Sequence, residues 1–387
     1  MTTRAVVCAR RLPLLALCVL FLQVQEHAPA HAAALVPGYA GIAARNLRLQ
    51  ALLDAAVRAG LPGVSLQVTG PGIDFEGTAG VANQATGEPF TAHHVMYVAS
   101  LGKTFTAVVA LQLCAERQLE LDVPITTWLP AAVTVHIPSS EQITLRHLLT
   151  HTSGLPDYLN DDTAWLTDFT RDPGRLWTHR DLIPYIQDRP LLFRPGRGFH
   201  YSNSNYILVG WILERVTGQP LHKLVRRRIL VPLGLKHTFN GKESAGIAAR
   251  VHGYIRRGSR IIDTTPWYDH YGLADAGIHS TAGELARFFR ALLATDRLLS
   301  WNMHREMTHV DESVRSHSRY GISIFVQRDT GGGKQWYSNN GVDPGYHADM
   351  LYFPDQDLTV VLLANASQGQ SDLLYEQLLS AVVRVAL

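Results

Sequence analysis

Residues 97–105 read Tyr-Val-Ala-Ser-Leu-Gly-Lys-Thr-Phe, and this stretch predicts the point where an extended apolar segment ends and a helix begins. Apolar residues then recur at spacings of three and four, as they do along one face of an α-helix. These apolar positions are Phe105, Val108, Val109 and Leu113. If Ser100 opens the helix, Lys103 lies one turn further on and beside the Ser100 hydroxyl.

A Ser and a Lys at this spacing suit nucleophilic catalysis. A Ser hydroxyl is a poor nucleophile until a neighbour takes its proton, and a Lys in an apolar site has a lowered pKa that fits it for this task. The helix N-terminus adds N–H groups and a partial positive charge, which stabilise an oxyanion on an attacked carbonyl. Ser100 is therefore the candidate nucleophile and Lys103 its candidate partner.

The alternative interpretation is an N-cap Ser followed by a solvated Lys, because Ser-x-x-Lys is a common pattern. Two features favour catalysis instead. No other Lys in the chain has a Ser three residues before it, and Gly102 adds no bulk beside the hydroxyl, which suits a bound substrate.

Composition bounds the class of protein. The 387 residues allow a large core in one elaborate domain or in two, and 46% apolar with 18% charged residues is ordinary for a globular protein. A formal charge of +2 argues against nucleic acid as a partner. The one basic run, residues 226–228, is typical of the solvated face of a helix.

The first 32 residues predict an export signal rather than part of the fold. An Arg-bearing start precedes a short apolar run over 12–22, and Ala30-His31-Ala32 offers a small-x-small cleavage site. We therefore expect a periplasmic or secreted protein that begins near Ala33. The apolar run is short for a membrane span, and no later stretch is apolar enough to form one.

Export has a consequence for the cysteines. Removal of residues 1–32 would remove Cys8 and Cys18 and leave only Cys114, so no internal disulfide is expected. Cys114 lies among apolar residues of the predicted helix, which indicates an inert core thiol.

Strand patterns occur at both ends of the chain, and helical patterns occur between them. A helix is predicted over 44–60, and strands over 64–68 and 73–81 flank the turn Gly70-Pro71-Gly72. Helices over 144–151, 206–216 and 285–293 alternate with Pro- and Gly-rich loops. The further predicted strands cover 320–327, 335–338, 347–353 and 358–364, with a turn at 331–333 between the first two and a closing helix over 371–385.

This order predicts an α+β fold within a single domain over 33–387. Its antiparallel sheet is formed by both chain ends and flanked by helices, and an all-helical lobe is inserted between them. The sheet subdomain is expected over about 40–115 and 290–387, and the lobe over about 116–289.

Two histidines raise the alternative of a metal site. His147 and His151 are four residues apart, on one face of the predicted helix 144–151. No acidic residue or third His falls at a useful spacing nearby. We therefore expect no metal, and nothing in the sequence implies a cofactor.

A Ser–Lys pair still needs a proton relay to the leaving group, and Tyr201-Ser202-Asn203 can supply one. The phenol of Tyr201 is a candidate acid–base group, and the amide of Asn203 can hold Lys103 and the substrate. The pattern Tyr-x-Asn also occurs at Tyr158 and Tyr337. The position of Tyr201, before a helix and inside the predicted lobe, favours it.

Together these motifs resemble the serine β-lactamase and penicillin-binding-protein superfamily. The resemblance is to the branch of class C β-lactamases, D-alanyl-D-alanine carboxypeptidases and related esterases. Ser100-Leu101-Gly102-Lys103 matches its Ser-x-x-Lys motif and Tyr201-Ser202-Asn203 its Tyr-x-Asn motif. Residues 148–155, Leu-Leu-Thr-His-Thr-Ser-Gly-Leu, and residues 352–355, Tyr-Phe-Pro-Asp, resemble two further segments of that branch, so the resemblance covers about 40–385.

The third motif of the family departs from its pattern in this chain. The family carries Lys-Thr-Gly or His-x-Gly on the strand that lines the site, where this sequence has Asn339-Asn340-Gly341. The resemblance implies that Asn203, Asn339, Asn340 and Gly341 bind substrate. It also implies that the backbone N–H groups of Ser100 and Val342 form the oxyanion hole.

The resemblance implies an exported serine hydrolase that works through an acyl-enzyme on a small molecule or peptide with an ester or amide carbonyl. Asn339 brings no charge, so an esterase or a D-amino-acid-specific peptidase is favoured. The alternatives are a class C-like β-lactamase, and a penicillin- or peptide-binding sensor without turnover. The general base stays open between Lys103 and Tyr201, because the pair titrates as a coupled unit.

Overall fold

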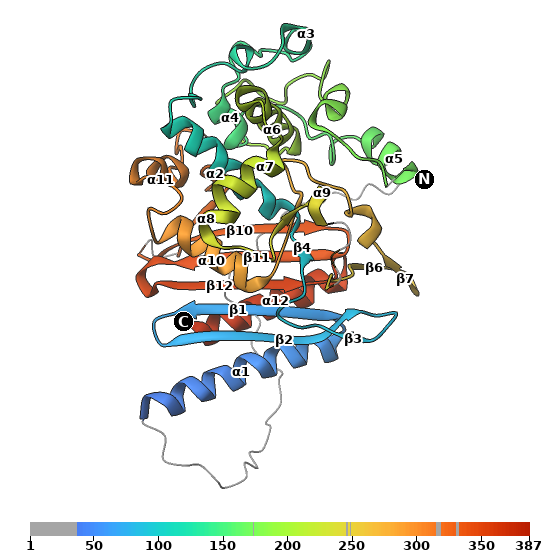
Figure 1. The fold of residues 1–387 in the computed structure, drawn as a ribbon, viewed down its shortest axis with the longest axis vertical. Helices are drawn as coiled ribbons and strands as arrows, with labels where there is room; N and C mark the ends of the chain where they lie inside the picture. The colour runs from blue at the N-terminus through green and yellow to red at the C-terminus, as the bar shows by residue number, and fades with distance from the viewer. Residues whose placement is uncertain (1–36, 173, 245–246, 248, 315–318, 330–332) are drawn as a thin grey trace. The chain divides into compact units, whose positions relative to one another are not determined.

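Strands from both ends of the chain form one antiparallel sheet in the computed structural model (Figure 1). The structure describes residues 37–172, 174–244, 247, 249–314, 319–329 and 333–387. The predicted export signal lies outside these residues, as do residues 331 and 332 of the predicted turn. The chain divides into a short unit, residues 1–40, and a large unit, residues 41–387, to which the following description applies.

Within the described residues, the sheet has seven strands in the order β3-β2-β1-β12-β11-β10-β9. The strands are β1 (Gly63–Gly70), β2 (Ile73–Asn83), β3 (Glu88–Pro89), β9 (Phe325–Arg328), β10 (Gln335–Asp343), β11 (Tyr346–Phe353) and β12 (Leu358–Ala364). The prediction of an antiparallel sheet built from both chain ends is confirmed, and β1 pairs with β12 from Val64 opposite Ala364 to Thr69 opposite Thr359.

The central strand β12 shows why the sheet is covered on both faces. Its sequence, Leu-Thr-Val-Val-Leu-Leu-Ala, is buried throughout, and successive side chains point to opposite faces. Val361 and Leu363 join one hydrophobic core, and Val360 and Leu362 join a second one. Continuous burial of this kind requires helices on each side of the strand.

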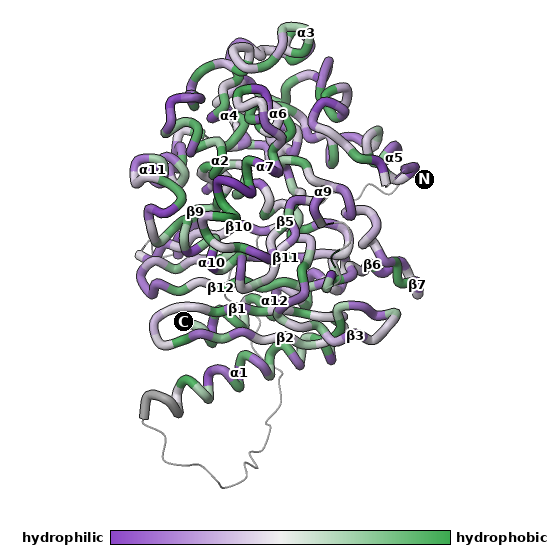
Figure 2. The backbone as a smooth tube through the Cα atoms, viewed as in Figure 1, coloured by the Kyte–Doolittle hydropathy of each residue, from purple (hydrophilic) through white to green (hydrophobic). Residues whose placement is uncertain are grey.

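The second core lies under the two terminal helices, α1 (Pro37–Ala59) and α12 (Gln370–Ala386). Leu49 and Leu53 of α1 and Leu378 and Val382 of α12 contribute to it. In Figure 2, hydrophilic and hydrophobic residues alternate along α1, as expected of a helix with one buried face.

The first core lies between the other face of the sheet and the central helices. These include α2 (Gly102–Ala115), α6 (Asn203–Thr217) and α10 (Ala282–Leu293). The rings of Phe105 in α2 and Phe288 in α10 stack with centroids 3.8 Å apart. Ser100 lies in a short 3₁₀ turn, η1 (Ala99–Leu101), which leads directly into α2. The predicted helix after Ser100 is thereby confirmed.

The inserted segment is not entirely helical, which corrects the prediction of an all-helical lobe. Its strands are β5 (Phe239–Asn240), β6 (Tyr254–Arg257), β7 (Arg260–Asp263) and β8 (Ile278–Ser280), and β4 (Met96–Tyr97) pairs with β8. Strands of two to four residues are too short to show a period-two pattern in the sequence. The pairing of β4 with β8 fixes the approach to Ser100.

The helices of the insert are short apart from α6. They are α3 (Ala131–Thr134), α4 (Leu145–Leu149), α5 (Ala164–Arg171), α7 (Leu221–Val225), α8 (Val231–Leu233) and α9 (Gly241–Ser244), and α11 (Trp301–Thr308) follows α10. Across the described helices, none combines the length and the apolar character that crossing a membrane requires.

Candidate active site

Ser100 is presented on a sharp turn between β4 and α2. Ala99, immediately before it, has a φ of 49°, a left-handed conformation that is uncommon for a residue with a side chain. Gly341 of β10 packs against this turn, because a Cβ there would lie 2.3 Å from the Val98 carbonyl oxygen and 2.9 Å from the Ser100 nitrogen. Only a glycine lets the strand approach the turn at Ser100 this closely.

Lys103 is completely buried beside Ser100. Its Nζ donates to Ser100 Oγ at 3.0 Å, to Asn203 Oδ1 at 2.7 Å and to the carbonyl oxygen of Asp275 at 2.5 Å. Burial lowers the pKa of Lys103 from its ordinary value, and nearby carboxylates, that of Asp275 first, partly offset this. The structure thus brings together the Ser, Lys and Asn that the motifs predicted.

The interpretation of Gly102 as room for a substrate is wrong. A Cβ on Gly102 would lie 1.7 Å from the carbonyl oxygen of Ala276, so protein backbone fills the space. The glycine lets the segment of Asp275 and Ala276 approach α2. This approach puts the Asp275 carbonyl on Lys103.

Tyr201 completes the cluster around Ser100. Lys103 Nζ lies 5.1 Å from the centroid of the Tyr201 ring. Burial raises the pKa of Tyr201, and hydrogen bonding to the Ser100 side chain partly offsets this rise. The phenol is therefore protonated near neutral pH, and it can donate a proton to a leaving group.

His151 supports the Tyr201 segment. Its Nδ1 accepts from the backbone N–H of Ser202 at 3.2 Å and contacts Asn205 Nδ2 at 3.1 Å, and its ring lies 4.2 Å from that of Tyr201. His147 instead accepts from the backbone N–H of Thr144 with its own Nδ1. The two histidines face different groups, and the described residues hold no cluster of three metal-binding side chains.

The third motif, which the resemblance assigns to substrate binding, makes contacts within the protein. Asn339 is buried, and its Nδ2 donates to Thr104 Oγ1 at 2.6 Å, while its Oδ1 accepts from the backbone N–H of Asn340. Asn340 is exposed and Gly341 faces the turn at Ser100. Val342, the next residue, does line the pocket together with Ser100.

The two rival Tyr-x-Asn matches lie elsewhere. Tyr337 is in β10 and its Oη contacts Gln335 Nε2. Tyr158 is buried, and its hydroxyl donates to the Asp275 carboxylate at 2.7 Å, so it supports the residue whose carbonyl holds Lys103. Neither is in the cluster around Ser100.

Sequence reasoning missed three carboxylates at the site. Asp157 accepts from the backbone N–H of Asn203 at 3.1 Å and from its Nδ2 at 3.0 Å, which fixes the amide that holds Lys103. Asp275 and Asp343 line the pocket. Asp157 lies two residues after the segment 148–155 and Asp343 directly follows Val342, so neighbouring motifs could have indicated both.

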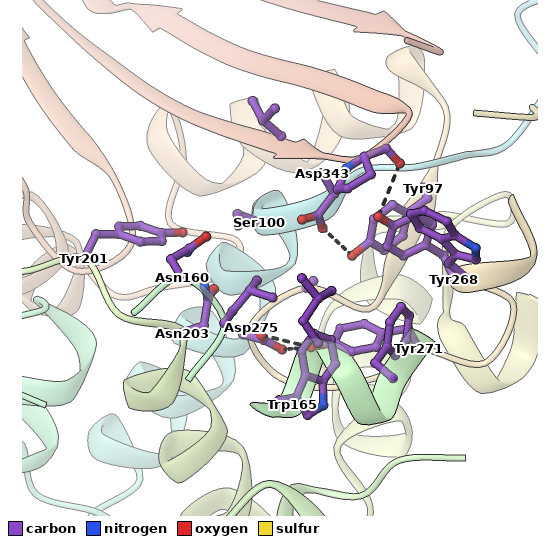
Figure 3. Close-up of a pocket in the computed structure, with 17 residues that line it drawn as sticks. Tyr97, Ser100, Asn160, Trp165, Tyr201, Asn203, Tyr268, Tyr271, Asp275 and Asp343 are labelled. Carbon is purple, nitrogen blue, oxygen red and sulfur yellow. Dashed lines mark hydrogen bonds between the residues drawn. The ribbon is translucent and has the colours of Figure 1, made fainter. Parts of the chain in front are cut away.

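The pocket in front of Ser100 is shown in Figure 3. Its cavity volume is about 170 Å³, and its mouth opens to solvent. Ser100, Tyr201 and Asn203 lie at one side of it, and aromatic side chains form much of the rest. The aromatic lining residues other than Tyr201 are Tyr97, Trp165, Phe169, Trp267, Tyr268 and Tyr271.

Fold and site together define the β-lactamase and transpeptidase type of serine hydrolase fold, with Ser100 in a turn at the start of a helix and a buried Lys one turn on. The chain belongs to the beta-lactamase family, whose model matches residues 49–383.

Two solved structures and an esterase are similar to the chain. A D-stereospecific amidohydrolase from Streptomyces sp. is 30% identical with a TM-score of 0.74, covering 86% of this chain and 97% of that one. The D-amino acid amidase of Ochrobactrum anthropi SV3, complexed with L-phenylalanine amide, is 26% identical with a TM-score of 0.75, covering 88% and 98%. Esterase EstB of Burkholderia gladioli is 34% identical over 204 residues, 49% of this chain and 50% of the esterase.

Proposed function

We propose that the protein is an exported serine hydrolase that cleaves an ester or amide through an acyl-enzyme formed on Ser100. The observation that carries the proposal is the buried Lys103 Nζ, which lies within hydrogen-bond distance of Ser100 Oγ, Asn203 Oδ1 and the Asp275 carbonyl at once. The similarity to amidohydrolase and amidase structures and to the sequence of an esterase supports the same reaction class.

The pKa directions favour roles for the two acid–base groups. Burial lowers the pKa of Lys103, which makes its neutral amine more available as the base that takes the Ser100 proton. Burial raises the pKa of Tyr201, which keeps the phenol protonated until the leaving group needs a proton. Lys103 is therefore assigned as the base and Tyr201 as the acid.

The reaction then runs in two halves. Ser100 Oγ bonds to the carbonyl carbon, its proton passes to Lys103, and the negative charge on the carbonyl oxygen is stabilised by the N–H groups of Ser100 and Val342. The tetrahedral intermediate expels the alcohol or amine, which takes a proton from Tyr201. Water then attacks the acyl-enzyme and gives a proton to the Tyr201 phenolate, while Ser100 Oγ leaves the carboxylic acid and takes its proton back from Lys103.

Reactivity of Ser100 tests this proposal directly. Intact-mass spectrometry after exposure to a fluorophosphonate is expected to show one adduct on the wild-type protein and none on Ser100→Ala. Ser371→Ala, a substitution at the start of α12, serves as the control and should label normally. Equal labelling of Ser100→Ala would overturn the nucleophile assignment, and a stable penicillin adduct without ester turnover would favour a sensor.

Export is part of the proposal and rests on the order of charge, apolar run and Ala-x-Ala over residues 1–32. N-terminal sequencing of protein recovered from outside the cytoplasm is expected to begin near Ala33. Protein recovered there that still begins at Met1 would contradict the cleavage of a signal peptide.

A further inference from the structure

The pocket in front of Ser100 is acidic. Asp275 and Asp343 line it, and none of the described lining residues is a Lys, Arg or His. Lys103 lies behind the nucleophile, with its Nζ already bound by three oxygen atoms. The lining therefore offers no cation to a carboxylate-bearing substrate, and it favours a positively charged one.

The two pocket carboxylates are not equivalent. Asp275 is buried and accepts from the hydroxyls of Tyr158 at 2.7 Å and Tyr271 at 2.9 Å, so protein donors already satisfy it. In the described part of the chain, Tyr97 is the one side chain that hydrogen-bonds the Asp343 carboxylate, at 2.8 Å to Oδ2. Oδ1 of Asp343 is left with capacity for a donor from a ligand.

Asp343 is held firmly in place. Its donor Tyr97 stacks on Tyr268 with ring centroids 4.2 Å apart and meets the edge of Tyr346 at 5.5 Å. In Figure 3 the Asp343 carboxylate points into the pocket, between Ser100 and Tyr97. A carboxylate fixed in this manner is a preorganised acceptor for an ammonium group.

The position of Asp343 also matters for the chemistry. It directly follows Val342, whose N–H is assigned to the oxyanion. An uncompensated carboxylate there opposes the negative charge that develops on the attacked carbonyl. A cationic group on the substrate beside that carbonyl cancels this opposition. Burial raises the pKa of Asp343 to about 6, so the carboxylate is ionised above that pH and pairs with an amine that is still protonated near neutrality.

The remaining wall of the pocket is aromatic, and Trp165, Phe169 and Trp267 are among its residues. Such a wall suits a large apolar side chain next to the ammonium group. An ammonium, a carbonyl and an apolar side chain on one small scaffold are the parts of an amino acid derivative.

We propose that Asp343, oriented by Tyr97, binds the free α-ammonium group of the substrate, and that the enzyme cleaves amides or esters of amino acids with large apolar side chains and an unblocked amino group. This inference rests on the proposed function and names its substrate class. N-acylated amino acids and carboxylate-bearing acyl groups are correspondingly poor substrates.

The test compares phenylalanine p-nitroanilide with its N-acetyl derivative, in both enantiomers, at pH 7. For the preferred enantiomer we expect kcat/KM to favour the free amine by about ten- to a hundredfold, the scale of a hydrogen bond between charged groups. Asp343→Asn, which keeps an acceptor for Tyr97, should reduce this preference below about threefold on the same scale. Asp355→Asn removes an equal charge from an exposed turn and should keep the full preference.

Two further measurements separate this inference from the proposed function. Hydrolysis of neutral p-nitrophenyl butyrate without any preference for free amines would overturn the ammonium site and leave the hydrolase standing. Binding of phenylalanine amide and of its N-acetyl derivative to Ser100→Ala, measured by calorimetry, needs no turnover. Selective binding of the free amine supports the ammonium site even if no substrate is hydrolysed, and equal binding of both overturns it.

Discussion

Asp157 offers the sharpest check on how the site is held together. Its carboxylate is 1% exposed and accepts from two buried donors of Asn203, the backbone N–H and Nδ2. Replacing it by Ala leaves both donors without a partner. A buried donor without a partner costs about 1–3 kcal/mol. Losing the buried carboxylate itself returns part of that cost, so Asp157→Ala should lower the free energy of unfolding by about 2–4 kcal/mol.

The same substitution should change catalysis in a defined direction. Asp157 is one of the carboxylates that raise the pKa of Lys103, so its loss lowers that pKa further. A base with a lower pKa is deprotonated at lower pH, and the acidic limb of the kcat/KM profile should therefore move to lower pH. The maximum rate should fall, because Asn203 no longer holds the amine in place.

Urea denaturation and a pH–rate profile on one ester measure both effects. Asp157→Asn keeps an acceptor for the Asn203 N–H and should lose less stability than Asp157→Ala. The acidic limb of its kcat/KM profile should move to lower pH by a similar amount. Asp355→Ala, in an exposed turn, is the control and should stay within about 0.5 kcal/mol of wild type. A loss below about 1 kcal/mol in Asp157→Ala with an unmoved limb would refute the role of this carboxylate.

Two other substitutions probe the geometry around Ser100. Gly341→Ala should lower kcat/KM on every substrate alike, because the new Cβ meets the backbone of the nucleophile turn; Gly333→Ala meets no atom within 4 Å and is the control. Preserved activity in Gly341→Ala would show that the turn at Ser100 can shift to accommodate the new Cβ without loss of activity. Tyr201→Phe should cost at least about a hundredfold in kcat, the usual scale for an acid–base group, while Tyr337→Phe should cost little. Comparable losses in the two Tyr variants, measured on the same ester, would reopen the choice of acid.

Local patterns predicted most of the sheet and its terminal helices. The strand pattern over 64–68 and 73–81 corresponds to β1 and β2, and the predicted strands over 347–353 and 358–364 correspond to β11 and β12. These elements are long enough to show a period of two, and their turns contain Gly or Pro. The short strands β5 and β8 could not be found in this manner, because β8 pairs with β5 and with β4, both far along the chain. Strands β6 and β7 pair with each other, but each has only four residues, too few to show a period of two.

The site residues that belong to short sequence motifs could be predicted. Ser100, Lys103 and Asn203 were identified from their own patterns, and the structure joins them by hydrogen bonds. Asp275 was not, because it reaches Lys103 through a backbone carbonyl, which any residue type provides. Asn339 was aligned with a cation of relatives, but its side-chain direction depends on Thr104 across the core and cannot be read from the strand alone.

The pairing of β1 with β12 bears on when the pocket in front of Ser100 can be completed during synthesis. Tyr97 and Asp343, which meet in the pocket, are separated by 246 residues, and β12 follows later still. At typical elongation rates the nascent chain carries Ser100 and Lys103 for on the order of tens of seconds before these partners exist. Until then β1 has an unpaired edge, the feature that templates association between chains. An unfinished chain thus lacks a complete pocket and can associate with other chains through the unpaired edge of β1. Synthesis of the last strands completes the pocket and pairs that edge.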